Sequence, residues 1–374
     1  KQRAWKLILK FLKGDQQISH ELLSQLEAAV GNVCESVLIQ TLFDLIVEKG
    51  KFDEVEVLLR DASQSQDLFT QYIQDIVPYE CYWRRIESAA EELVPSKRGG
   101  HQMCWDPVSK RILLFGGWDG NQDLADFWIF DTGSMSWSCI SQDARLENGP
   151  GPRSCHKICL HASKRLVYVF GRFVEQDSRT GTANISLASE LYQYDLEAHC
   201  WTLISEDVSS KGGPPLVYDH QMVVDEQNDQ IWVFGGRIIS GNTLSGEDPQ
   251  YSGLYVYHIN EDRWECVRDD SFDLQPAKSP ILRSRIGHSM ILDPDARQLH
   301  IFAGQRNKDY LADYYIYDIS TDTVVACEKD TSRSGGPDPG FTQRSTIDLG
   351  RGEIYLFTGL MREKQTSLSA ASSS

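Results

Sequence analysis

Five short apolar runs recur from residue 101 onward, and each one ends in a pair that contains glycine. Four of the pairs close a run of four large apolar residues, as in Ile112-Leu113-Leu114-Phe115 before Gly116-Gly117, and the remaining pair follows Leu299-His300-Ile301-Phe302. The later pairs are Gly171-Arg172, Gly235-Gly236, Ala303-Gly304 and Thr358-Gly359. A polar anchor stands 16 residues before the second member of every pair, at His101, His156, His220, His288 and Gln343. A strand-rich repeat of this length indicates a radial array of β-sheets.

Each repeat also predicts a third and a fourth strand. The pattern at Asp126–Asp131 predicts a third strand, with counterparts at 191–195, 254–257 and 314–318. The fourth strand begins at Trp137, Trp201 or Trp264, and at Val324 in the fourth repeat. We therefore predict a β-propeller of four complete four-stranded blades followed by a half-blade.

Two residue types are expected to be structural in every repeat. Glycine closes each second strand because a neighbouring backbone must approach there, and tryptophan fills the space between adjacent sheets. The predicted structural positions are Gly116, Gly117, Gly171, Gly235, Gly236, Gly304, Gly359, Trp137, Trp201 and Trp264.

The first ninety or so residues follow a helical period instead. Trp5, Ile8, Leu9 and Leu12 fall on one face of a helix, and four further stripes of this kind follow before Pro78. Short connections between the stripes predict antiparallel neighbouring helices. The apolar side chains proposed to bind a partner are Leu42, Leu45, Phe52, Leu59 and Phe69, although a core role stays open for each of them.

Both halves of the chain resemble known families. The anchor His after an Arg, the glycine doublet, the Tyr-Gln-Tyr-Asp strand at 192–195 and the spaced Trp are similar to the kelch repeat. The segment 45–53 with its flanking helices resembles a CTLH module, and the helices ahead of it resemble a LisH region. A CTLH-like segment followed directly by kelch repeats resembles the muskelin family, and 115–128 and 340–344 are close to it.

The chain is therefore predicted to have four parts. Residues 1–92 form an α-helical LisH/CTLH-like interaction module, and residues 93–100 form a linker. Residues 101–360 form the kelch-type propeller, and residues 361–374 form a serine-rich disordered tail. The expected fold is thus a multidomain combination of an α-helical module and an all-β propeller.

Composition narrows the classes of partner. The chain has 37 Lys and Arg against 54 Asp and Glu, a net charge of −17, which argues against nucleic-acid phosphate as a ligand. No apolar run approaches the length of a membrane span. Nine cysteines lie scattered without a Cys-x-x-Cys pair, as is typical of reduced thiols in a cytoplasmic or nuclear protein.

Catalytic chemistry finds little support in the sequence. The four anchor histidines occupy equivalent positions, one in each repeat, which indicates copies of a structural role rather than a metal site. There is no Gly-x-Ser-x-Gly motif, no phosphate-binding loop and no HExxH motif. We expect no enzymatic activity and no cofactor. A copper-type kelch oxidoreductase and a cytoskeleton-linked kelch protein remain the alternatives.

The remaining expectation is protein recognition. Loops on a rigid propeller carry binding residues, and the candidates follow the glycine pairs: Trp118, Asp119, Arg172, Arg237 and Arg306. Arg98, Arg153 and Arg285 precede an anchor His by three residues, and bind either a partner or blade carboxylates such as Asp126 and Asp313. The muskelin resemblance implies an adaptor subunit of a CTLH-type ubiquitin ligase, with LisH/CTLH proteins as partners and homo-oligomerisation left open.

Overall fold

The computed structural model describes residues 85–86, 93–174, 186–241, 248–270, 281–350, 352–357 and 359–361. The chain divides into two units, Lys1–Arg85 and Ile86–Ser374, and all described strands belong to the second. The predicted helical module and the proposed disordered tail lie outside the described residues. Among the described residues, no helix is long and apolar enough to cross a membrane.

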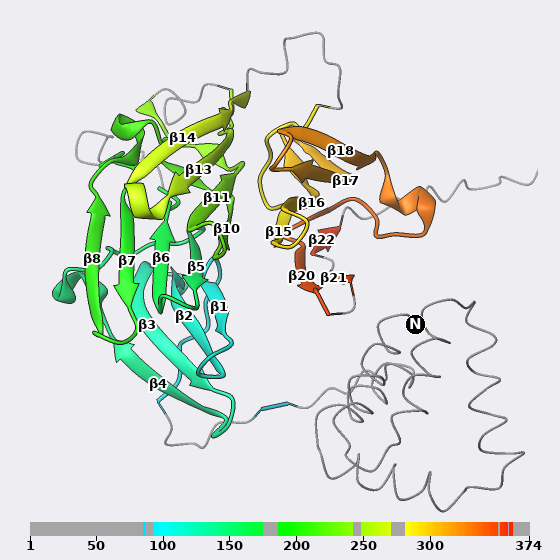
Figure 1. Cartoon of the computed structure of the whole chain (residues 1–374). Coiled ribbons are helices and arrows are strands. Elements are labelled where there is room, and N and C mark those ends of the chain that lie inside the picture. Colours follow the sequence, from blue (N-terminus) through cyan, green and yellow to red (C-terminus); the bar gives the residue numbers. More distant parts are fainter. Residues whose placement is uncertain are drawn as a thin grey trace, which may run out of the picture. The chain divides into compact units, whose positions relative to one another are not determined.

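The second unit contains four antiparallel four-stranded sheets, in each of which neighbouring strands follow one another along the chain, apart from the short β12 between the second and third strands of the third sheet (Figure 1). The first blade consists of β1 (Gln102–Asp106), β2 (Arg111–Trp118), β3 (Asp123–Asp131) and β4 (Ser136–Ser141). The second consists of β5 (Lys157–His161), β6 (Leu166–Phe170), β7 (Leu191–Asp195) and β8 (Cys200–Ser205). The predicted propeller blades are confirmed.

The remaining blades follow the same plan. The third blade consists of β10 (Gln221–Asp225), β11 (Gln230–Phe234), β13 (Leu254–His258) and β14 (Arg263–Arg268). The fourth consists of β15 (Ser289–Asp293), β16 (Gln298–Arg306), β17 (Asp309–Asp318) and β18 (Thr323–Glu328), and the half-blade of β20 (Arg344–Asp348) and β21 (Glu353–Phe357). Two short ladders pair β9 (Val217–Tyr218) with β12 (Arg237–Ile238) and β19 (Gly340–Phe341) with β22 (Leu360–Met361).

The third strands of two blades are longer than the sequence prediction. In the first blade this strand begins at Asp123 rather than Asp126, because it continues to pair with β2 as far as Trp118 past an irregularity after Phe115. In the fourth blade it begins at Asp309 rather than Tyr314, because it pairs with β16 as far as Arg306 past an irregularity after Phe302. The first strand of each blade lines the central cavity, and we call it the inner strand. Each anchor lies immediately before an inner strand, as His156 precedes β5. The anchors are therefore free to point toward a neighbouring blade.

The hydrophobic core lies between successive blades rather than within one. Between the first two blades, Phe115 and Phe127 pack against Trp201 at ring centroid distances of 5.5 and 5.7 Å. Between the second and third, Phe170 packs against Trp264 at 6.0 Å. Both tryptophans are only 6% exposed, and burial of side chains this large stabilises each seam by several kcal/mol. Trp137 packs against Phe130 of its own blade at 5.1 Å.

Candidate recognition site

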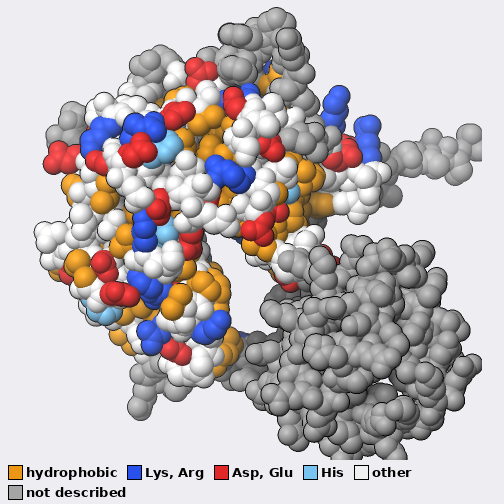
Figure 2. Space-filling model, viewed as in Figure 1, with side chains coloured by type: hydrophobic (Ala, Val, Ile, Leu, Met, Phe, Trp, Pro, Cys, Tyr) orange, Lys and Arg blue, Asp and Glu red, His pale blue; other side chains and the backbone are white. Residues whose placement is uncertain are grey.

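The two ends of the propeller have different chemistry. We call the end where the inner strands begin the anchor face, and the end that carries the turns between first and second strands the hairpin face. The inner strands β1, β5, β10, β15 and β20 face a common axial cavity of about 460 Å³. Its wall is mainly apolar and includes Ile158, Val223, Ile291 and Ile347. Figure 2 shows hydrophobic side chains gathered along the hollow that opens in this view, and charged side chains of both signs over the outer surface.

Each buried anchor histidine packs against an aromatic ring of the preceding blade. His156 lies edge-on against Phe115, His220 against Phe170 and His288 against Phe234, with ring centroids 5.2 to 5.5 Å apart. All three histidines are fully buried, and their ring nitrogens have no hydrogen-bond partner among the described residues. Burial first, then nearby cations, holds the pKa of each well below its usual value. The aligned histidines thus serve as neutral packing groups.

The glycine pairs leave space for these anchor histidines. A Cβ on Gly235, whose φ is +73°, would lie 2.5 Å from the carbonyl oxygen of Arg285 and 2.7 Å from the His288 ring. The second glycine, Gly236, faces the anchor of its own blade, and a Cβ placed on it would lie 2.8 Å from the His220 Cβ. A glycine pair therefore lets two anchors and a backbone approach one strand end.

A chain of backbone hydrogen bonds links the blades at the anchor face. The residue before each anchor adopts a positive φ of 53° to 63°, namely Gly100, Cys155, Asp219, Gly287 and Thr342. Each N–H from Cys155 onward donates to the carbonyl oxygen of the equivalent residue one blade earlier, at 2.8 to 3.1 Å. These bonds fix the blades around the axis with no side chain involved.

The arginines that precede the anchors bind inside their own blades. Arg98 donates to both carboxylate oxygens of Asp126 and to the carbonyl of Gly116. Arg285 pairs with Asp313 and the carbonyl of Ala303, and Arg153 pairs with Glu190 at 3.1 Å. The structure thus favours blade carboxylates over a partner for these three guanidinium groups.

Each inner strand begins with a polar residue at the anchor face. These first residues are Gln102, Lys157, Gln221, Ser289 and Arg344. Neighbouring blades contact one another through them, because Lys157 Nζ donates to Gln102 Oε1 at 3.3 Å and Ser289 Oγ lies 2.6 Å from Ser345 Oγ. We call these five residues the axial polar ring.

Lys157 is the unusual member of the ring. The residue is 6% exposed, and among the described residues its ammonium group donates to the Gln102 amide oxygen rather than to a carboxylate. Burial lowers the pKa of Lys157 to about 7, and repulsion from Arg344 acts in the same direction. Burial also raises the pKa of nearby Asp219, despite the attraction of Lys157. The ring therefore holds an amine that lacks a matched counter-charge.

The candidate loop residues lie on the anchor face but differ in how far their side chains are accessible to a partner. Trp118 is 40% exposed, while its backbone pairs with Gly99. Asp119 Oδ1 accepts hydrogen bonds from the N–H groups of Asn121 and Gln122, which lower its pKa. These two residues form an ordered turn with an accessible indole.

The three candidate arginines also differ. Arg172 donates to the carbonyl of Ser186 at 2.6 Å, and Arg237 pairs through its backbone with Tyr218. Arg306 is held by both oxygens of Asp270 and lies 4.6 Å from the centroid of the Tyr251 ring. Its guanidinium is thus engaged within the propeller. The proposed helical contacts Leu42, Leu45, Phe52, Leu59 and Phe69 lie outside the described residues.

Sequence reasoning missed the axial polar ring, although a signal was present. Each ring residue directly follows an anchor, and in the four complete blades it stands directly before an apolar run such as Ile158-Cys159-Leu160. Aligning the residue after each anchor would have shown Lys157 and Arg344 at equivalent positions.

Comparison with known proteins agrees with this architecture. The family model for the KLHDC2/KLHL20/DRC7 Kelch-repeats domain matches residues 61–271, more than half of the chain. The chain belongs to this kelch-repeat family. Kelch propellers are generally interaction domains rather than enzymes.

Three curated relatives illustrate the range of kelch proteins. Mei4-dependent protein 6 of Schizosaccharomyces pombe is 31% identical over 71% of this chain and 36% of its own length. Leucine-zipper-like transcriptional regulator 1 of Homo sapiens is 26% identical over 48% of this chain and 19% of its own length. An F-box/kelch-repeat protein of Arabidopsis thaliana is 26% identical over 68% and 49%. The chain spans less than half of each, and none of these names denotes muskelin or an enzyme.

The oxidoreductase alternative needs converging ligands near the axis. Within the described part of the chain, no three His, Cys, Asp or Glu side chains gather so as to hold a metal ion. The three buried anchor histidines instead lie in separate seams, each against its own phenylalanine.

Proposed function

We propose that the propeller binds a partner protein at its anchor face, where Lys157 and Arg344 receive an acidic group of that partner. The main observation that supports this proposal is the buried Lys157 ammonium group, whose only described hydrogen bond goes to the Gln102 amide. A charged amine in that position gains from an incoming carboxylate, because the anion replaces the hydration that burial removed. The exposed Trp118 indole supplies the kind of aromatic contact that anchors protein interfaces.

The test compares partner capture by matched variants of the whole chain. Lys157→Gln with Arg344→Gln removes both cations of the ring, whereas Lys110→Gln with Arg111→Gln removes two exposed cations near the hairpin face. Proteins captured by the wild-type chain are identified by mass spectrometry, and their acidic residues are changed to amides. We expect the ring variant and the amide changes to abolish binding, and the control variant to retain it. Equal capture by both variants contradicts the proposal.

We further propose that the chain is an adaptor or oligomerising subunit of a CTLH-type ubiquitin ligase, acting in the cytoplasm and also in the nucleus. The muskelin-like order of a CTLH-like segment and kelch repeats supports this assignment. The helical module would dock onto other LisH/CTLH proteins through some of Leu42, Leu45, Phe52, Leu59 and Phe69, because a small helical domain leaves apolar surface uncovered.

Changing each of these five residues to Asp separates docking from folding. A buried interface position loses partner binding and retains helicity, since the new charge has no counter-ion, whereas a core position loses both. Circular dichroism beside a pull-down of CTLH-bearing proteins distinguishes the two. The assignment fails if every variant that loses binding also loses helicity, or if residues 1–95 can be deleted without loss of partners.

A further inference from the structure

At the hairpin face, equivalent positions of successive blades pair a nitrogen base with a carboxylate across each of three seams. The first partner is the last residue of an inner strand, at Asp106, His161 or Asp225. The second is the last turn residue of the next blade's hairpin, at Arg165, Asp229 or Arg297, each with a positive φ of 52° to 59°. We call the two positions the strand-end position and the turn position.

Two of the seams use an acid at the strand end and a base at the turn. Asp106 accepts hydrogen bonds from both terminal guanidinium nitrogens of Arg165, each at 2.7 Å. Asp225 accepts one from Arg297 at 2.9 Å. Both carboxylates are essentially buried, with 1% and 0% of the side chain exposed. A mismatch at either carboxylate would therefore leave a buried charge unpaired.

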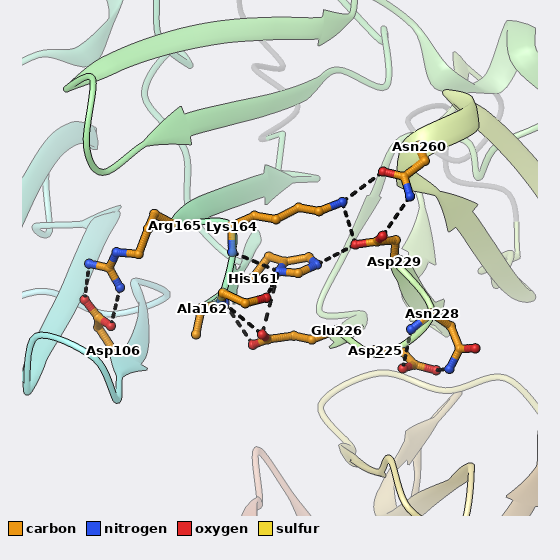
Figure 3. A network of polar contacts seen from close by, with 11 residues as sticks. Asp106, His161, Ala162, Lys164, Arg165, Asp225, Glu226, Asn228, Asp229 and Asn260 are labelled. Carbon is orange, nitrogen blue, oxygen red and sulfur yellow. Dashed lines mark hydrogen bonds and ion pairs between the residues drawn. The ribbon is translucent and has the colours of Figure 1, made fainter.

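The seam between the second and third blades reverses this polarity (Figure 3). His161 Nε2 lies 2.8 Å from Asp229 Oδ1, so the base stands at the strand end and the acid at the turn. Lys164 and Asn260 also hold Asp229, at 2.5 and 2.7 Å. Glu226 makes a second contact across this seam, because its carboxylate accepts hydrogen bonds from the N–H groups of Ala162 and Ser163 at 2.8 and 3.0 Å. Lys164 and Glu226 are the other charged groups that face His161 across this seam.

The reversal affects assemblies in which one blade is skipped and two blades that are not neighbours in the native fold come into contact. If the second blade were left out, Asp106 of the first blade would meet Asp229 of the third, two carboxylates in a buried position. If the third blade were left out, His161 of the second would meet Arg297 of the fourth, two donors. Both single-blade omissions are thus electrostatically disfavoured, whereas all three native seams are matched.

We propose that the reversed His161–Asp229 pair fixes blade order, because an assembly that skipped the second or the third blade would place two carboxylates or two donors against one another. Repeat proteins need such a device because similar units can dock on the wrong neighbour or exchange between chains. The glycine pairs, anchors and aromatic fillers recur from blade to blade and cannot tell one neighbour from another. The base–carboxylate pairs differ in polarity from seam to seam, and they lie at the three seams between the four complete blades.

The test gives the reversed seam the polarity of the other two. His161→Asp, Lys164→Ser and Asp229→Arg keep a native acid–base pair, and Ser is the residue at the equivalent hairpin position, Ser109. In this variant Asp106 would attract the new guanidinium at position 229, and the new carboxylate at position 161 would attract Arg297. Both skipped-blade assemblies then gain a matched pair. A control with three charge-preserving changes, Lys110→Arg, Arg165→Lys and Arg297→Lys, leaves the pattern intact.

Assembly is read out with a cross-linking reporter after refolding from urea. Val108→Cys and Gln227→Cys place thiols at the exposed hairpins of the first and third blades, which the second blade separates in the native order. A short bismaleimide and peptide mapping then detect the 108–227 link against the background of native cysteines. We expect a several-fold increase in the seam variant and none in the control, with a matching loss of monomer by size-exclusion chromatography.

A second variant covers the case in which the triple change prevents refolding. Asp229→Asn removes the repulsion with Asp106 but adds no attraction, and leaves Lys164 with its Asn260 contact at 2.9 Å. We expect an intermediate, roughly two-fold rise in the 108–227 link. The proposal is overturned if the seam variant refolds with the same link and monomer yield as the control, or if Asp229→Asn behaves as the wild-type chain does.

Discussion

His156 lies edge-on against Phe115 of the preceding blade, with ring centroids 5.5 Å apart and ring planes at 86°. The contact recurs in the next two seams as Phe170 with His220 and Phe234 with His288. A repeated anchor thus holds the blades together by burying a neutral imidazole beneath an aromatic ring, in an aromatic pair of favourable geometry.

Acid is expected to destabilise the propeller through these three histidines. Their pKa values are lowered in the folded state, so the unfolded chain binds more protons once the pH falls below about 6.5. Stability is therefore complete above that pH and decreases below it, by up to about 1.4 kcal/mol per pH unit for each histidine. Urea unfolding across this range measures the slope.

Replacing a histidine by glutamine checks the source of that slope. Gln343 is the natural anchor of the half-blade and does not titrate, so His156→Gln should reduce the acid sensitivity by about a third. His199→Gln, at an exposed site on the second blade, is the matched control and should leave the slope unchanged. An unchanged slope in His156→Gln would show that other groups cause the acid sensitivity.

Gly235→Val should destabilise the third seam strongly. The new side chain would require a positive φ of 73° and place its Cβ 2.5 Å from the Arg285 carbonyl, a backbone atom that cannot move alone. Strain and overpacking together predict a loss of about 3 kcal/mol or more in the free energy of unfolding. Gly99→Ala is the control, because nothing lies within 4 Å of the position that its Cβ would take. Thermal unfolding that shifts equally little in both would refute the close approach.

Arg285→Met alone should lower the free energy of unfolding strongly, whereas Arg285→Met combined with Asp313→Leu should lower it little. Arg285 is 1% exposed and pairs with Asp313, so its removal leaves a carboxylate and the Ala303 carbonyl without their donor. Removing one member of such a buried pair costs about 3 to 5 kcal/mol, whereas replacing both by apolar residues is often neutral. Denaturant unfolding of Arg285→Met, Asp313→Leu and the double variant completes the cycle. Additive losses would contradict the pairing.

The repeat positions were predictable from sequence because the constraint on them is local. Gly116, Trp201 and the anchors belong to patterns that recur at fixed offsets, because neighbouring blades meet in the same way at successive seams. The axial polar ring was not predicted, since Gln102, Lys157 and Ser289 share a place but no chemistry. The His161–Asp229 pair joins residues 68 apart in different repeats, and no periodicity reports such a contact.

Lys157→Met should stabilise the protein while it weakens recognition. The folded pKa of about 7 lies below the usual 10.5, so the unfolded chain binds the extra proton between these values. The lysine therefore costs stability at neutral pH, and this cost disappears as the pH rises toward 10.5. An apolar side chain of similar length removes it, so the melting temperature should rise at pH 7 and the gain should shrink at about pH 10.

Partner capture should fall in the same Lys157→Met variant, as expected of a site where function opposes stability. Lys110→Met, at an exposed turn, is the matched control and should change neither property. A Lys157→Met chain that melts at the wild-type temperature at both pH values would show that surrounding groups compensate this amine well. A chain that captures partners undiminished would show that the amine lies outside the recognition site, because a buried cation that binds an acidic partner cannot be replaced by an apolar side chain without loss of affinity.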